Sequence, residues 1–199
     1  MSATPPIVFG ITGASGAPYA VRLLQALTAA HRPVSLVVSK YGMRLLATEA
    51  GIESMDSLRD TVGIEAWASY VEVFSNDDRG AAPASGSSRA AGMIVCPCSM
   101  GTLSAIAVGA SRSLIERAAD VTLKEQRKLV LVPRETPLSA IHLGNMLRLT
   151  RAGAVVMPAA PGFYHRPKGI PELVDFIVQR IVDQLGLEIE LAPRWGGES

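Results

Sequence analysis

Six short aliphatic runs alternate with longer amphipathic segments along the 199 residues, and this alternation limits the possible folds more than any other feature. The runs predict strands at Ile7–Ile11, Val34–Val38, Val71–Phe74, Met93–Cys96, Leu129–Val132 and Ala154–Met157. The segments between them predict helices at Gly16–Ala30, Tyr41–Ala50, Ser57–Ala68, Met100–Gly109, Ile115–Gln126, Leu138–Thr150 and Pro171–Leu185. Such alternation is typical of a doubly wound, mostly parallel sheet covered by helices on both faces. We therefore expect a single α/β domain over residues 1–199, Rossmann-like and three-layered.

Composition supports this class and excludes several functions. Hydrophobic residues make up 48% of the chain and aromatic residues only 5%, which indicates an aliphatic core. Nineteen basic and 18 acidic residues leave a net charge of +1, so no basic excess is available to neutralise a nucleic acid. No apolar segment approaches the ~20 residues that cross a bilayer, and "MSATPPIVFGITGAS" lacks a basic leader. We expect a cytoplasmic protein that binds neither membranes nor nucleic acids.

The two cysteines predict neither a disulfide nor a metal site. Cys96 and Cys98 are only two residues apart, a spacing that gives poor disulfide geometry. No second group of cysteines and histidines accompanies them, as a zinc site would require. We expect buried, reduced thiols.

In a parallel sheet, ligands bind beyond the carboxyl ends of the strands, so the residues that follow each strand are the candidates. After the first strand, "GITGASGA" places Gly13, Ala14 and Ser15 before a helix, where backbone N–H groups can hold a phosphate. The spacing is not that of a dinucleotide fingerprint, and "VVSK" ends the second strand without an acidic residue, which argues against NAD. A tight connection with no ligand remains the alternative.

A second potential anion site follows the fourth strand. There "CPCSMGTLSAIA" opens a helix of small residues with Ser99, Met100, Gly101 and Thr102. An ordinary capped helix start explains the same residues equally well. Ser39, after the second strand, is either a helix cap or a ligand-facing hydroxyl.

Charged residues near the fifth and sixth strands supply the remaining candidates. Arg134 and Glu135 directly follow a buried strand, and Arg117 and Lys124 lie two helical turns apart on the preceding helix. These basic groups either form a solvated stripe or converge on an anion. Among the residues after the sixth strand, Tyr164 lies in a proline-rich loop. Three candidates remain. His165 is adjacent to Tyr164. Arg180 lies in the last helix and could equally reach solvent, and Glu49 is by default a solvated charge.

Together, the motifs resemble those of the UbiX-type flavin prenyltransferases, a family of flavoproteins. The matching pieces are "GITGASGA", "SK", "CPCSMGTLSAIA", "LIERAADVTLKEQRKLVLVPRETPL", "GAVVMPAAPGFYHRP" and "PRW", in this order along the chain. The resemblance implies a Rossmann-like enzyme that joins the dimethylallyl group of dimethylallyl monophosphate to reduced FMN, without a metal. The product, prenylated FMN, is the cofactor of UbiD-type decarboxylases, some of which serve ubiquinone biosynthesis. The family also implies a homododecamer.

The resemblance assigns roles by position. The residues implied to contact FMN are Gly13, Ala14, Ser15, Ser39, Ser99, Met100, Gly101, Thr102 and Arg134. The residues implied near the prenyl phosphate are Lys124, Tyr164 and Arg180, with Arg117 and the neighbouring subunit's Glu49 close by. Glu135 is implied to be the acid/base residue, and Lys124, Tyr164 and Glu49 to take part in catalysis. Whether the donor is the monophosphate or the diphosphate stays open.

Other functions fit these motifs less well or explain fewer of them. A flavin-dependent cysteine decarboxylase of the same superfamily would carry a histidine after the second strand, where "VVSKYG" has none, and a "PxMNxxMW"-like run, which "PRETPLSAIHLGNML" replaces. Direct decarboxylation of a polyprenyl hydroxybenzoate lacks a group to handle a phenolic acid. A non-catalytic flavin carrier stays open. No motif covers residues 51–70, with Trp67, or the Gly/Ser/Ala-rich loop 75–92, which is either a surface connection or a lid. Trp195 in the tail needs an apolar place to sit.

Overall fold

The structure is a computed structural model that describes residues 4–192, so the expectation about Trp195 lies outside the described residues. Six parallel strands form one sheet: β1 (Ile7–Ile11), β2 (Val34–Val38), β3 (Val71–Phe74), β4 (Gly92–Cys98), β5 (Leu129–Pro133) and β6 (Val155–Val156). Their order is β3-β2-β1-β4-β5-β6. Ile7 is in register with Val34 of β2 on one side and with Gly92 of β4 on the other. The strand order reverses between β1 and β4, as in doubly wound dinucleotide-binding folds.

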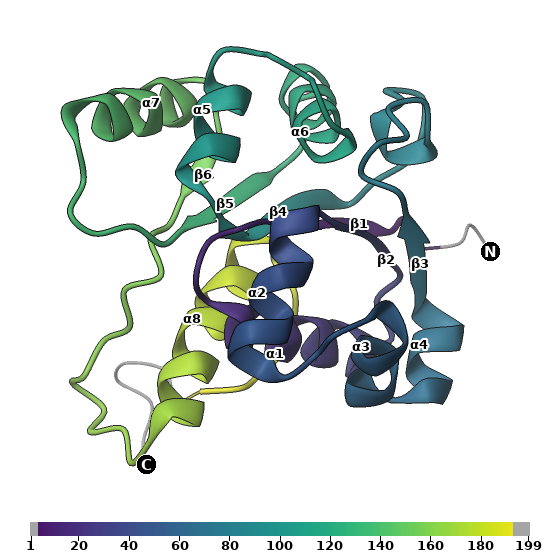
Figure 1. Cartoon of the computed structure of the whole chain (residues 1–199), viewed down its shortest axis with the longest axis vertical. Helices are drawn as coiled ribbons and strands as arrows, with labels where there is room; N and C mark the ends of the chain where they lie inside the picture. The colour runs from purple at the N-terminus through teal and green to yellow at the C-terminus, as the bar shows by residue number, and fades with distance from the viewer. Residues whose placement is uncertain (1–3, 193–199) are drawn as a thin grey trace.

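Helices cover both faces of this sheet. On one face lie α5 (Met100–Ala107), α6 (Leu114–Lys124) and α7 (Ala140–Arg151), and on the other lie α1 (Ala17–Ala29), α3 (Met55–Val62), α4 (Ile64–Tyr70) and α8 (Ile170–Gln184) (Figure 1). Helix α2 (Lys40–Ala50) packs beside α1. A single turn of 3-10 helix, η1 (Ala82–Ala84), interrupts the loop between β3 and β4. The predicted three-layer α/β class is therefore confirmed.

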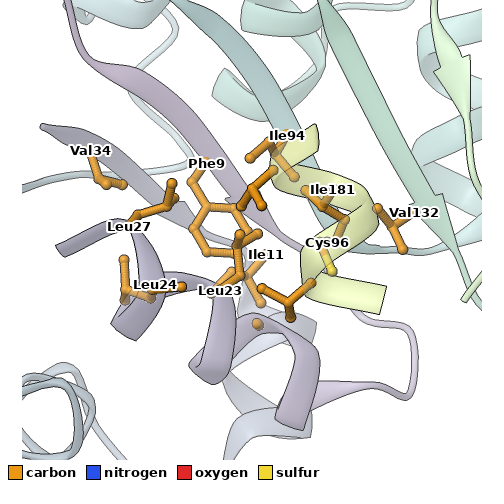
Figure 2. Packing of buried hydrophobic residues seen from close by; sticks show 14 of the residues in the cluster. Phe9, Ile11, Leu23, Leu24, Leu27, Val34, Ile94, Cys96, Val132 and Ile181 are labelled. Carbon is orange, nitrogen blue, oxygen red and sulfur yellow. The ribbon is translucent and has the colours of Figure 1, made fainter. Parts of the chain in front are cut away.

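The two faces of the sheet have separate hydrophobic cores because side chains alternate along each strand. Phe9 points toward α1 and α8, where it packs with Leu23, Leu27 and Ile181 (Figure 2). Its neighbour Val8 points to the opposite core, which α5 and α6 cover. The fully buried β1 thus holds both helix layers, and its carboxyl end is fixed from both sides.

Some predicted boundaries were wrong for local reasons. The helix expected at Ser57–Ala68 is two helices, because Gly63 has a φ of 111° and ends α3. The helix expected from Leu138 begins at Ala140, since the Ser139 side chain caps it. Strand β4 continues through Pro97 to Cys98, two residues beyond the predicted end.

Two further observations concern the described residues only. None of the helices within residues 4–192 is both long and apolar enough to cross a membrane. Cys96 and Cys98 are free and buried, as the sequence predicted. Burial raises the pKa of the Cys98 thiol to about 12 and raises that of Cys96 as well.

Candidate functional site

A cavity of about 210 Å³ lies beyond the carboxyl ends of the first four strands. Thr12 and Gly13 follow β1, Ser39 follows β2, Asn76 follows β3 and Ser99 follows β4, and all of them line it. The cavity therefore spans the point where the strand order reverses, which is where doubly wound sheets bind their ligands.

Three helices begin at this cavity, each with a serine as its N-cap. The Ser39 hydroxyl accepts a hydrogen bond from Gly42 N at 3.0 Å, and the Ser99 hydroxyl accepts one from Thr102 N at 3.2 Å. Ser113 caps α6 in the same way. A helix N-terminus carries partial positive charge, so three of them around one cavity favour an anion.

One wall of the cavity contains a carboxylate, Glu116, which is only 8% exposed. Its Oε2 accepts a hydrogen bond from the backbone N–H of Arg112 at 2.8 Å, and its Oε1 accepts one from the Arg112 guanidinium at 3.2 Å. The arginine thus compensates the buried negative charge, as a buried carboxylate requires.

The glycine-rich turn after β1 is occupied by an anion of the protein itself. Glu49, in the last turn of α2, accepts hydrogen bonds at its Oε2 from Gly16 N at 2.8 Å and from Ala17 N at 2.9 Å. These N–H groups, at the N-terminus of α1, have no partner within the helix, and the sequence analysis predicted that such groups hold a phosphate. In this structure the anion at that helix end is Glu49 of the same chain, so no neighbouring subunit is needed to bring Glu49 to the turn.

Arg134 joins this cluster from the end of β5. Its Nε donates to the Ser15 carbonyl oxygen at 3.3 Å, which ties β5 to the turn. Partial burial raises the pKa of the Glu49 carboxyl, but the two backbone N–H groups, the Ser15 hydroxyl and the charge of Arg134 outweigh it, so this pKa lies below its usual value. Glu49 is therefore a carboxylate at neutral pH.

Close backbone contacts shape the cavity rim at two glycines. A Cβ at Gly42 would lie 2.4 Å from the Ile11 carbonyl oxygen, and a Cβ at Gly13 would lie 2.4 Å from Tyr41 Cβ. Only glycine lets α2 approach the end of β1 this closely. The helix N-terminus that carries Ser39 is held against the cavity as a result.

The other expected FMN contacts and the acid/base candidate are placed as follows. Gly13, Ser39, Ser99 and Thr102 line the cavity. Met100 is buried in the core beneath α5, whereas Gly101 is exposed on the first turn of that helix. Glu135 is exposed at the end of β5, and its Oε1 accepts a hydrogen bond from Thr136 N at 3.2 Å.

The basic residues of α6 do not converge on the cavity within one chain. Lys124 ends the helix whose other end lines the cavity, about 16 Å away for an 11-residue helix. There Lys124 forms a salt bridge with Glu125, beside Gly86 of the loop 75–92. Arg117 donates to Asp120 at 2.8 Å.

Tyr164 and Arg180 lie near each other at helix α8, Tyr164 in the loop before the helix and Arg180 on the helix itself. Tyr164 contacts Phe176 of that helix with ring centroids 5.8 Å apart, and Arg180 lies one turn further along. Arg180 forms a salt bridge with Asp183 at 3.5 Å. The described chain thus holds the expected phosphate ligands in separate groups.

The sequence reasoning missed several lining residues: Thr12, Tyr41, Asn76, Ser113, Ile115 and Glu116. Two signals were available. Ser113 and Glu116 have the spacing of a capping box before an apolar run. Asn76 lies two residues after the end of the third strand, so the rule that identified Ser39 and Ser99 applied to it as well.

Comparisons with known proteins point to one family. The family model described as Flavoprotein matches residues 1–182. Flavin prenyltransferase UbiX of Pseudomonas aeruginosa is 50% identical over 98% of this chain and 96% of its own length. The crystal structure of AnUbiX (PadA1) in complex with FMN and dimethylallyl pyrophosphate has a TM-score of 0.89 at 43% identity and covers 99% of this chain and all of its own. The dodecameric FMN-dependent UbiX-like decarboxylase of Escherichia coli O157:H7 has a TM-score of 0.87 at 44% identity, over 96% of this chain and all of its own.

Proposed function

The chain belongs to the flavin prenyltransferases of the flavoprotein family, and on this basis we propose where and how its residues act. The reaction joins the dimethylallyl group of a prenyl phosphate to reduced FMN. The observation that carries the proposed location is the convergence of three serine-capped helix N-termini on one cavity at the carboxyl edge of the sheet.

The cavity fits the phosphate end of FMN. Its serine and threonine hydroxyls and its helix N-termini are donors suited to a phosphate, and Arg112 already neutralises the one buried carboxylate. Ser39, Ser99, Thr102 and Ser113 would hold the phosphate, and Gly13 would let the chain approach closely. Reduced FMN supplies the nucleophilic ring atoms that take the prenyl group.

We place the prenyl phosphate beside the neighbouring turn, next to Glu135, with Arg134 contacting FMN there as the family resemblance implies. The basic side chains that complete the phosphate site would stabilise the negative charge that develops on the departing phosphate. A proton leaves the reacting ring as the new ring closes, and the exposed Glu135 carboxylate would accept it or pass it to phosphate. Glu49 would keep the turn and Arg134 in place as the reaction proceeds.

Lys124, Arg117, Tyr164 and Arg180 would complete the phosphate site across a contact between subunits. This assignment explains why they lie away from the cavity within one chain, and it agrees with the dodecamer named for a relative. The exposed apolar residues of α7, Ile141, Leu143 and Leu147, offer a surface for such contacts. We therefore propose a homododecamer. We also propose dimethylallyl monophosphate as the donor, because a site with three basic groups suits the smaller anion.

The remaining assignments are also proposals. A UbiD-type decarboxylase would receive the prenylated FMN, in ubiquinone biosynthesis or in aromatic catabolism. The free, buried cysteines agree with a reducing compartment, and we propose that the protein acts in the cytoplasm. All 199 residues would form one domain, since the described part is built on a single sheet.

The test is anaerobic incubation of the purified protein with reduced FMN and dimethylallyl monophosphate, followed by mass spectrometry of the extracted flavin. We expect a mass gain of one prenyl unit, reduced at least 100-fold in rate by Glu135→Gln, because general acid–base groups contribute about 10²–10⁴-fold. Tightly bound but unmodified flavin would instead indicate a carrier, and release of carbon dioxide from a hydroxybenzoate by the protein alone would indicate direct decarboxylation.

A further inference from the structure

The imidazole ring of His165 makes no hydrogen bond within residues 4–192. Both ring nitrogens are buried and have no hydrogen-bond partner among residues 4–192. Its ring instead lies flat against Phe176, with centroids 5.4 Å apart and 4° between the planes. Because neither nitrogen is used, the contribution of His165 comes from the shape of its ring.

Tyr164 is held by this stack and by a glycine. Tyr164 and His165 are the two central residues of a turn that Arg166 closes by donating its N–H to the Phe163 carbonyl oxygen at 3.0 Å. The Tyr164 ring meets His165 edge-on, with centroids 5.5 Å apart and 79° between the planes, and it meets Phe176 in the same manner. Edge-to-face pairs of this kind are favourable and directional.

Gly162 supports the tyrosine from a third side. A Cβ added there would lie 2.9 Å from Tyr164 Cε1 and 3.2 Å from Phe176 Cζ, so any other residue would displace the ring. Tyr164 is nevertheless 53% exposed, which leaves one side of its ring open to a ligand.

Helix α8, on which these rings pack, is held in the hydrophobic core. Phe176 belongs to α8, whose residues Ile177, Val178 and Ile181 are buried in the core. Asp175 of the same helix forms a salt bridge with Arg22 of α1. The loop that carries Tyr164 is thus stacked on a helix that cannot easily move, and Arg180 lies one turn further along that helix.

We propose that His165 and Phe176 are positioning residues that fix Tyr164 for the phosphate of the prenyl substrate. The inference rests on the proposed function, because it gives Tyr164 the role of a phosphate ligand. A loop residue held in one orientation binds without first losing conformational entropy, so the stack contributes to substrate affinity rather than to the chemical step.

Two measurements on the full-length holoenzyme test this. The first is steady-state prenylation, where Phe176→Leu and His165→Ala should raise KM for dimethylallyl monophosphate about tenfold, with kcat and FMN affinity within twofold of wild type. His165→Phe keeps a flat ring and should leave KM unchanged, while its melting temperature rises because two unpaired nitrogens are removed.

The second measurement reports the position of Tyr164 without turnover. The chain has four tyrosines, and fluorotyrosine labelling should give a ¹⁹F resonance for Tyr164 that moves toward its solvent-exposed value in Phe176→Leu. Tyr70→Leu is the matched control, since Tyr70 pairs with His31 at a similar centroid separation of 5.3 Å but lies far along the chain. It should change neither KM nor that resonance.

The outcomes separate the two proposals. Wild-type protein that does not prenylate FMN would overturn the proposed function, whereas an unmoved Tyr164 resonance in Phe176→Leu would overturn the positioning role alone. Equal loss in His165→Phe and His165→Ala would also overturn it, because the ring nitrogens would then be what matters.

Discussion

Replacing Glu49 by Gln tests whether this carboxylate stabilises the turn at the start of α1. The change keeps the size of the side chain and an oxygen acceptor for Gly16 N and Ala17 N, but it removes the charge. An anion at a helix N-terminus contributes about 0.3–1 kcal/mol, and the nearby Arg134 adds an attraction that solvent screens. We expect the free energy of unfolding to fall by about 1 kcal/mol at pH 7.

The assay is urea unfolding at a fixed protein concentration, where about 1 kcal/mol corresponds to a midpoint lower by ~0.5 M for an m-value of about 2 kcal/mol/M. The pH dependence gives the sharper test. The pKa of Glu49 is lower in the folded protein than in the unfolded chain, so its contribution is present above the unfolded value of about 4.3. It is lost as the pH falls through the folded pKa, so the gap between wild type and variant should narrow as the pH is lowered from 7 to 3.

The control is Glu53→Gln, because no hydrogen bond or ion pair of the Glu53 side chain is found within the described part of the chain, and its midpoint should not change at either pH. A Glu49→Gln midpoint equal to wild type at pH 7 would refute the reasoning. So would a gap that persists undiminished at pH 3, since it could not come from the carboxylate charge.

Three other predictions have defined outcomes. Gly42→Ala should lower the melting temperature by about 6–12 °C, since its Cβ would meet the Ile11 carbonyl and overpacking costs up to about 3 kcal/mol, whereas Gly144→Ala, in open space on α7, should raise it by about 2 °C. Cys98 should resist alkylation at pH 8 until urea unfolds the protein, because burial raises its pKa to about 12; rapid labelling of the native protein would contradict this. Glu116→Gln should tighten FMN binding about three- to tenfold in a fluorescence titration if the phosphate lies in the cavity, since the Arg112 charge that the carboxylate now neutralises would be left to attract the phosphate; unchanged affinity would place the phosphate elsewhere.

Local pattern was enough to determine the fold and part of the site. Aliphatic runs such as Leu129–Val132 become buried strands wherever they pack, and the side-chain period of two sends Phe9 and Val8 to opposite cores. The rule that ligands lie beyond strand ends selected Gly13, Ser39 and Ser99, because it depends only on where each strand stops. Asn76 obeyed the same rule and was overlooked.

Tertiary structure decided which groups meet. Glu49 is 33 residues from Gly16 in the chain, and nothing in its helix distinguishes it from a solvated charge, yet α2 packs beside α1 and delivers its carboxylate to the turn. The sequence left open whether Lys124 and Arg117 form a solvated stripe or converge on an anion. Helix α6 runs back along the sheet and carries Lys124 to the end of the helix that lies away from the cavity. Sequence patterns report the local environment of a residue, whereas contacts between distant residues depend on how whole elements pack, and periodicity carries no record of that packing.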